Sequence, residues 1–125
     1  MKLIALFTLL LSSACLAKPE VIAVSDSGFI VENKVHIDAP AEVVWTALIN
    51  DIDKWWPKSH SWWGEEGKFT LQAKAGGCFC EMAGSRSAQH MQVVFVDPQK
   101  VLRMTGGLGP LQGMGMFGSL DWVFE

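Results

Sequence analysis

The chain has 125 residues, a net charge of −3 and 50% hydrophobic residues. This length suits one domain with a sizeable core and leaves no room for a second domain of ordinary size. Its Lys and Arg residues are scattered singly, which excludes the clustered basic surface of a nucleic-acid-binding protein.

A signal peptide is expected over residues 1–17, because Lys2 precedes the apolar run 3–11 and small residues follow it. That run is shorter than the about 20 residues of a membrane-spanning helix, so no stable membrane insertion is expected. Residues 12–15, Ser-Ser-Ala-Cys, bear a slight likeness to a lipoprotein box but lack the usual Leu three positions before Cys15. Simple cleavage, which gives a periplasmic or secreted protein, is therefore favoured over a lipid anchor.

Residues 18–28 are expected to form a linker that leads into one continuous domain over residues 29–125. The domain opens with a predicted strand over residues 29–37, a stretch rich in β-branched side chains. Asp38 is expected to cap the helix that follows, and Pro40 is acceptable in the first turn of that helix.

The helix is predicted over residues 41–49. Val44, Trp45 and Leu48 fall on one stripe at spacings of three and four, so this face should pack on a sheet.

Two pairs of adjacent Trp residues, Trp55-Trp56 and Trp62-Trp63, lie in the next segment, where Pro57 prevents a long helix. In each pair one ring can point inward while the other must point elsewhere. The inward rings would complete the core, or they would form the rim of a pocket on which an apolar ligand stacks.

Five strands are predicted in the rest of the chain, and turn residues separate them. Their expected ranges are 68–75, 78–83, 89–96, 101–105 and 119–124. The long connection over residues 106–118 is rich in Gly and Met. Its apolar side chains would lid a pocket, or would contact a helix that follows the last strand.

This order of elements resembles the START-like superfamily, also called SRPBCC. The segments that carry the likeness are Asp-Ala-Pro-Ala-Glu-Val-Val-Trp at 38–45, Gly-Gly-Cys-Phe-Cys-Glu at 76–81 and Leu-Arg-Met-Thr-Gly-Gly-Leu-Gly-Pro-Leu at 102–111. They are most similar to an exported bacterial branch of the polyketide-cyclase/dehydrase and chaperone-ATPase-activator-homologue group.

The resemblance implies an α+β helix-grip fold, in which a curved antiparallel sheet wraps around a helix and leaves space for a hydrophobic molecule. Family members typically finish with one more strand and a long C-terminal helix, so the chain is expected to be incomplete at its C-terminus. The family shares no single catalytic set, so function must be argued from pocket residues. The resemblance implies no cofactor.

A small hydrophobic molecule is the expected partner, and non-catalytic binding is the expected function. The candidate ligand-binding residues are Trp45, Trp56, Trp62, Glu81, His90 and Met104. The alternative is a cyclase- or dehydratase-like enzyme in which Glu81 or His90 moves a proton within the pocket. Arg103 is a further polar residue on a predicted strand, and for all three polar residues solvent exposure remains the default placement.

Cys78 and Cys80 lie two apart on a predicted strand, so both side chains should point to one face. Their Cα atoms would be about 6.5 Å apart, near the upper limit for a disulfide, although export favours oxidation. If Cys80 were opposite His90, two thiols and an imidazole would make a candidate metal site. A one-residue slip would send His90 to the other face, so no metal is assigned, and a buried Cys pair or a redox-labile disulfide remain the alternatives.

Overall fold

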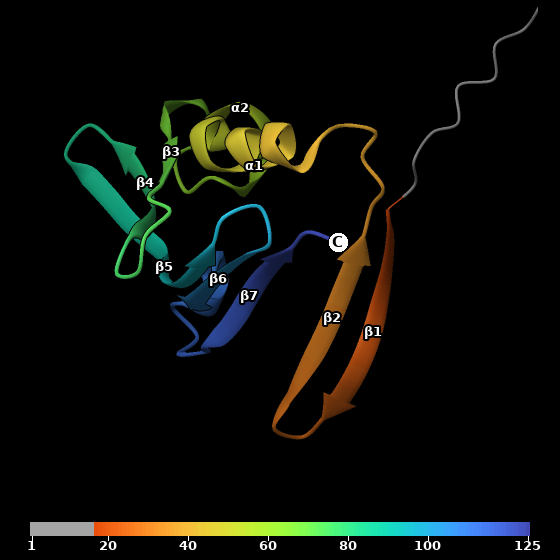
Figure 1. Cartoon of the computed structure of the whole chain (residues 1–125). Helices are drawn as coiled ribbons and strands as arrows, with labels where there is room; N and C mark the ends of the chain where they lie inside the picture. The colour runs from red at the N-terminus through yellow and green to blue at the C-terminus, as the bar shows by residue number, and fades with distance from the viewer. Residues whose placement is uncertain (1–16) are drawn as a thin grey trace, which may run out of the picture. The chain divides into compact units, whose positions relative to one another are not determined.

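The computed structural model describes residues 17–125, which form two compact units that meet at Asp38 and Ala39 (Figure 1). The signal peptide expected over residues 1–17 lies outside the described residues, apart from Ala17. Among the described residues, the helices are all too short or too polar to cross a membrane. The first strand expected for the domain over residues 29–125 lies in the first unit.

The first unit contains a β-hairpin of β1 (Lys18–Ser25) and β2 (Gly28–Lys34). The expected linker over residues 18–28 is therefore a strand and a turn. Its sequence explains the difference, since Val21 and Val24 favour extended backbone and a Gly-containing turn follows them. Val21 pairs with Val31, and the register shifts by one residue after this pair.

The second unit combines short helices with a five-stranded antiparallel sheet in the order β3-β4-β5-β6-β7. The helices are α1 (Ala41–Asn50) and α2 (Ile52–Trp55), with 3₁₀ turns at Lys58–His60, Gly64–Glu66 and Gly109–Leu111. The strands are β3 (Lys68–Leu71), β4 (Cys78–Ala83), β5 (Arg86–Asp97), β6 (Val101–Gly106) and β7 (Gly118–Val123). The predicted α+β class and the strand meander are confirmed.

Helix α1 begins where the sequence predicts, but Asp38 does not cap it. Pro40 is the N-cap residue, and its carbonyl oxygen accepts hydrogen bonds from the N–H groups of Val43 and Val44 at 2.9 and 3.2 Å. Asp38 lies two residues before that position, and the helix has no side-chain cap. The cap prediction was wrong because an N-cap side chain must come from the residue that directly precedes the first turn.

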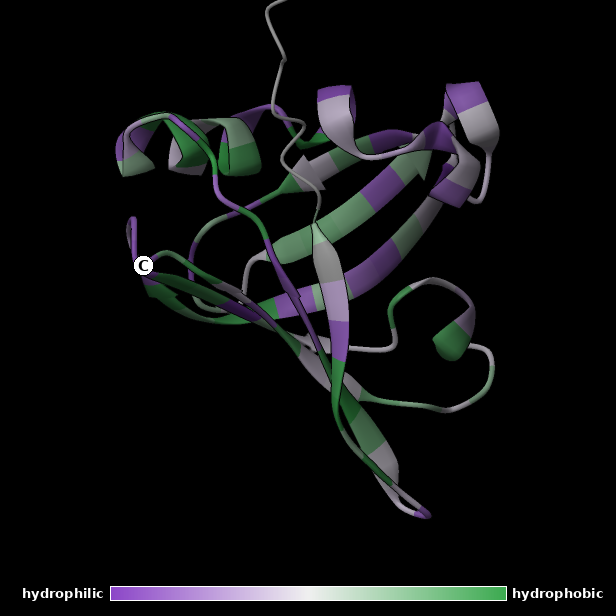
Figure 2. Cartoon of the chain, turned by 90° about the vertical axis from the view of Figure 1, so that its right-hand side faces the viewer, coloured by the Kyte–Doolittle hydropathy of each residue, from purple (hydrophilic) through white to green (hydrophobic). Residues whose placement is uncertain are grey.

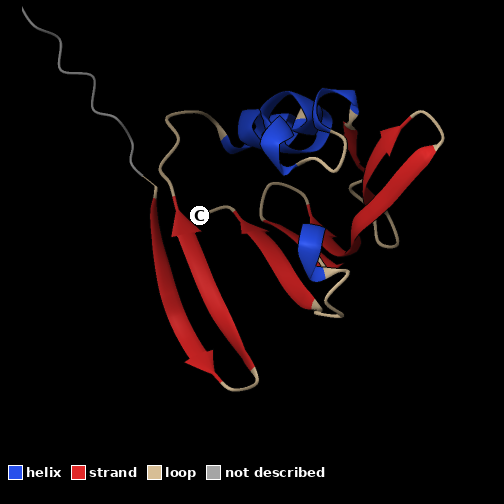
Figure 3. Cartoon of the chain, turned by 180° about the vertical axis from the view of Figure 1, so that it is seen from behind, coloured by secondary structure: helices blue, strands red, loops and turns tan. Residues whose placement is uncertain are grey.

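The helices lie over one face of the sheet, where the core of the second unit forms (Figures 1 and 3). Figure 2 shows the alternation of hydrophilic and hydrophobic residues along the strands that creates this face. The buried core residues are Leu48, Ile52, Phe69, Leu71, Phe79, Met91, Val93, Leu102 and Met104. Leu48 is the buried member of the predicted helical stripe, while Val44 and Trp45 are half-buried.

Strand β5 carries two irregularities that change its pairing. Against β4 the register shifts between Phe79 and Cys80, which leaves His90 as an additional residue between Gln89 and Met91. Against β6 the register shifts again, around Val94. A bulge bends a strand and re-aims its side chains, and here it allows two consecutive residues, His90 and Met91, to be buried together.

Candidate functional site

A buried carboxylate, Glu81 on β4, is the centre of the candidate site. Its side chain has no exposed surface. One carboxylate oxygen, Oε1, accepts a hydrogen bond from the Ser61 hydroxyl. The other, Oε2, accepts from the Trp62 backbone N–H at 3.2 Å and is 2.9 Å from Nε2 of His90. Both oxygens are therefore occupied by donors from one loop, at Ser61 and Trp62, and from the neighbouring strand β5.

Glu81 is held in its charged form. Burial raises the pKa of its carboxyl group, but the hydrogen bonds from Ser61, Trp62 and His90 together lower it more, so the pKa of Glu81 lies below its usual value. An ionised carboxylate only accepts hydrogen bonds, so the proton in the contact between Glu81 and His90 belongs to Nε2 of His90. In the neutral imidazole this leaves Nδ1 as the acceptor.

Gly67 makes the close packing around the carboxylate possible. The residue is buried just before β3, and a Cβ atom placed there would collide with Oε1 of Glu81 and with the hydroxyl oxygen of Ser61. Its φ of −65° is open to any residue, so the requirement for Gly is one of space and not of backbone conformation.

A pocket of about 290 Å³ lies beside His90. It lies beside residues 89–91 of β5, which are not paired with β6. The pairing of β5 with β6 begins at Gln92. The lining residues are Gln89, His90, Met91, Gln92, Thr105, Gly106, Gly107, Gln112 and Phe117. The pocket thus combines amide and hydroxyl groups with the apolar side chains of Met91 and Phe117.

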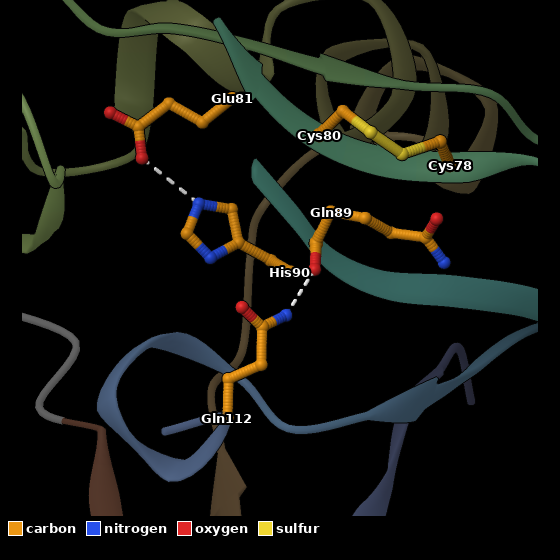
Figure 4. The surroundings of a disulfide bond; sticks show 6 residues. All are labelled: Cys78, Cys80, Glu81, Gln89, His90 and Gln112. Atoms are coloured by element: carbon orange, nitrogen blue, oxygen red, sulfur yellow. Dashed lines mark hydrogen bonds and ion pairs between the residues drawn. A yellow bond between two sulfur atoms is a disulfide. The ribbon is translucent and has the colours of Figure 1, made fainter. Parts of the chain in front are cut away.

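The segment between β6 and β7 closes one side of this pocket. The side-chain amide of Gln112 donates a hydrogen bond to the backbone oxygen of Gln89 and so ties the segment to β5. Figure 4 shows Gln112 on the opposite side of the His90 ring from Glu81. Gly106 lies against the bulge, because a Cβ there would be 3.1 Å from the backbone oxygen of His90. Phe117 is the apolar side chain of residues 106–118 that lines the pocket, and both expectations for this segment stay predictions.

The arrangement of Ser61, Glu81 and His90 is not that of a nucleophilic triad. In such a triad the imidazole lies between the hydroxyl and the carboxylate, because it must take the proton of the hydroxyl. Here the carboxylate lies between the other two groups, and the Ser61 hydroxyl donates to it. The chemistry that remains is hydrogen bonding or proton transfer at His90.

The six predicted ligand-binding residues do not form one site. Trp45, Trp56 and Met104 belong to the hydrophobic core or pack against it, and the Trp56 ring centroid is 5.0 Å from that of Phe79. Trp62 is 49% exposed. Glu81 and His90 are joined directly, and His90 is the predicted residue that lines the pocket.

Arg103 points away from the core. It forms a bidentate ion pair with Asp121, its cross-strand partner on β7, with N···O distances of 2.7 to 3.1 Å. Its neighbours on β6, Leu102 and Met104, are buried, so the alternation of the strand places Arg103 on the outer face.

Cys78 and Cys80 form a disulfide, and their Cα atoms are 5.4 Å apart (Figure 4). The disulfide fits because the distance between these two Cα atoms is shorter than the distance between alternate residues of a regular strand, on which the sequence-based expectation rested. Cys80 pairs with Gln89 and not with His90, so the candidate metal site is not assembled. No group of three or more His, Cys, Asp or Glu residues suited to a metal occurs between Ala17 and Glu125.

Sequence reasoning missed Ser61 and the pocket residues Thr105 and Gln112, while Phe117 belongs to the segment whose apolar side chains were expected to lid a pocket. Ser61 lies in a loop between two 3₁₀ turns, and its position follows from tertiary contacts. Phe117 had a weak signal, since an apolar ring among glycines in a long loop is typical of a residue that meets a ligand or another surface.

Comparison of the chain with protein-family models, with curated proteins and with solved structures gave no match.

Proposed function

We propose that the chain is an exported START-like domain that binds a small hydrophobic molecule carrying one hydrogen-bonding group. The observation that supports this best is the pocket beside His90, where polar and apolar side chains converge on one space. Ligand pockets combine an apolar lining with a few placed polar groups in this way. The strand meander with helices over one face agrees with the START-like resemblance, and the apolar N-terminal segment supports export.

The ligand would meet two kinds of surface. Phe117 and Met91 offer apolar contact, while His90 and Gln112 offer hydrogen bonds. Because Glu81 fixes the orientation of the His90 ring, the imidazole would contact the ligand without losing rotamer freedom on binding. A hydroxyl donor on the ligand suits the Nδ1 acceptor.

A fluorescent apolar probe tests this proposal. Titration of the full chain with 8-anilinonaphthalene-1-sulfonate should show saturable binding, which Phe117→Ala weakens several-fold. Met114→Ala is the matched control, because Met114 lies in the same segment, is 67% exposed and is not a pocket residue. Equal loss of binding in both variants, or no saturable binding by the wild-type chain, would contradict the proposal.

The second candidate function is proton transfer in a cyclase- or dehydratase-like reaction. The hydrogen bond between Glu81 and His90 favours it, since a carboxylate that orients an imidazole makes that imidazole a better base. Both oxygens of Glu81 are occupied, so His90 would be the catalytic residue and Glu81 a positioning residue.

Isotope exchange separates the two functions. Apolar molecules that co-purify with the chain are incubated with it in heavy water and analysed by mass spectrometry. Deuterium that enters a ligand with the wild-type chain but not with His90→Gln supports proton transfer. A ligand that binds to both and returns unlabelled supports binding alone.

A further inference from the structure

The disulfide between Cys78 and Cys80 connects residues that the strand already keeps close. Their sequence separation is 2, and both lie on β4, which pairs with β3 on one side and β5 on the other. A disulfide stabilises mainly by constraining the unfolded chain, and this effect is smallest for short loops. Both cysteines belong to the same strand, so the disulfide does not link two different elements and contributes little to the stability of the fold.

Both cysteines lie on the face of the sheet that points away from the core. They are half-buried, whereas Phe79 between them is fully buried. Their cross-strand partners on β5, Gln89 and Gln92, are exposed. A small thiol therefore has access to this pair from solvent, as thiol–disulfide exchange requires.

The disulfide is directly opposite the bulge that contains His90. The 5.4 Å between the Cα atoms of Cys78 and Cys80 is shorter than the about 6.6 Å of alternate residues in a regular strand. The register between β4 and β5 changes within the same three residues, between Phe79 and Cys80. The disulfide and the register change therefore share one short stretch of β4, next to the position where the ladder accommodates His90.

We propose that Cys78–Cys80 is a reversible exchange site for a thiol reductant, and that its redox state is transmitted through the bulge to His90. A thiolate of the reductant attacks one Sγ atom and forms a mixed disulfide, while the other Cys leaves as a thiolate and takes a proton from water. A second reductant thiol then attacks the mixed disulfide, which releases the oxidised reductant and the second cysteine thiol. Two thiols of the reductant are oxidised and one protein disulfide is reduced.

Thiol counting in glutathione buffers tests the exchange. The full chain should carry Cys15→Ser, so that the count reports on Cys78 and Cys80 alone. Without denaturant, an excess of reduced glutathione should expose two thiols per chain with an unchanged circular dichroism spectrum, and oxidised glutathione should remove them again. A pair that stays oxidised until denaturant is added, or a chain that unfolds on reduction, would show that the disulfide is structural.

Nuclear magnetic resonance of the imidazole signals at fixed pH tests the transmission. Reduction should shift the His90 signals, and the variant with both Cys78→Ser and Cys80→Ser should reproduce the reduced position. His60, which is exposed on the 3₁₀ turn Lys58–His60, is the control and should not move. A His90 signal that stays in place on reduction would refute the transmission. These measurements need no ligand, so they stand apart from the proposed binding function.

Discussion

Glu81 and His90 are joined by a 2.9 Å hydrogen bond although the sheet does not pair them with each other. The cross-strand partner of Glu81 is Ala88, and His90 lies two residues further along β5. Because alternate residues of a strand point to the same face, His90 lies on the same face as Ala88 and Glu81. The bulge begins at His90, and its effect is to bring Met91 onto this face as well.

Replacement of Glu81 by Gln should lower the free energy of unfolding by about 2 kcal/mol, because the hydrogen bonds that it accepts lose the charge of the acceptor. Urea unfolding measures this. Glu66→Gln is the control, since the Glu66 side chain is 74% exposed and pairs with Arg86 at the surface. We expect the control to change stability by less than about 1 kcal/mol. Equal effects of the two substitutions would show that the buried hydrogen bonds of Glu81 stabilise the chain no more than a surface ion pair does.

The stability of the chain should fall at acid pH. Glu81 has a pKa below its usual value in the folded chain, so its contribution is complete above about pH 4.3, the ordinary pKa of Glu, and is lost as the pH falls through the folded value. Asp53 acts in the same direction, since the hydrogen bond from Lys58 is the main cause that lowers its pKa.

Free energies of unfolding measured between about pH 3 and 6 test whether stability falls as the pH is lowered. The Glu81→Gln variant retains the Asp53 contribution and should show a shallower acid loss than the wild-type chain. Curves of equal slope would mean that Glu81 titrates in the folded chain as it does in the unfolded one.

Gly67→Ala should destabilise the chain by about 1 to 3 kcal/mol, the range for overpacking a buried site. The added Cβ would displace Ser61 or the Glu81 carboxylate. Gly118→Ala is the matched control, because a Cβ there would meet no atom within 4 Å and its φ is not in the left-handed region. Thermal unfolding of both variants decides the point, and a neutral Gly67→Ala would mean that the loop around Ser61 moves aside at little cost.

Trp56→Ala should cost about 3 to 5 kcal/mol, since the ring packs against Phe69 and Phe79 in the core. Trp62→Ala should be near neutral for stability, because 49% of Trp62 is exposed. Chemical unfolding separates the two. A large loss with Trp62→Ala instead would place the core contact in the other Trp pair.

Alternation and turn residues were sufficient to predict the helix from Ala41 and the order of the five strands, because both signals are local. The hairpin strand β1 was missed although Val21 and Val24 carry β-propensity. The stretch over residues 18–28 was instead interpreted as a linker that leads into the domain. Helix-grip identity goes beyond local signals and remains a proposal.

The candidate site was predictable only in its chemistry. Glu81 and His90 stand out as polar residues on apolar strands, but their contact depends on the register that pairs Glu81 with Ala88, and the sequence left this register open. Strict alternation would leave only one of His90 and Met91 inward, and the structure buries both. Ser61 and Gln112 lie in loops, and such positions are set by the packing of distant segments.

Asp53 and Lys58 form hydrogen bonds with the backbone beside and at the start of β3. β3 is an edge strand, and Asp53 accepts the backbone N–H of Phe69 at 2.8 Å while the Lys58 ammonium donates to the backbone oxygen of Gly67 at 2.6 Å. These are the groups that an approaching strand of another chain would need for pairing. Two side chains joined by their own ion pair thus occupy two backbone groups at this edge, one on β3 and one on Gly67 just before it, so that these two groups are not open to a strand of another molecule.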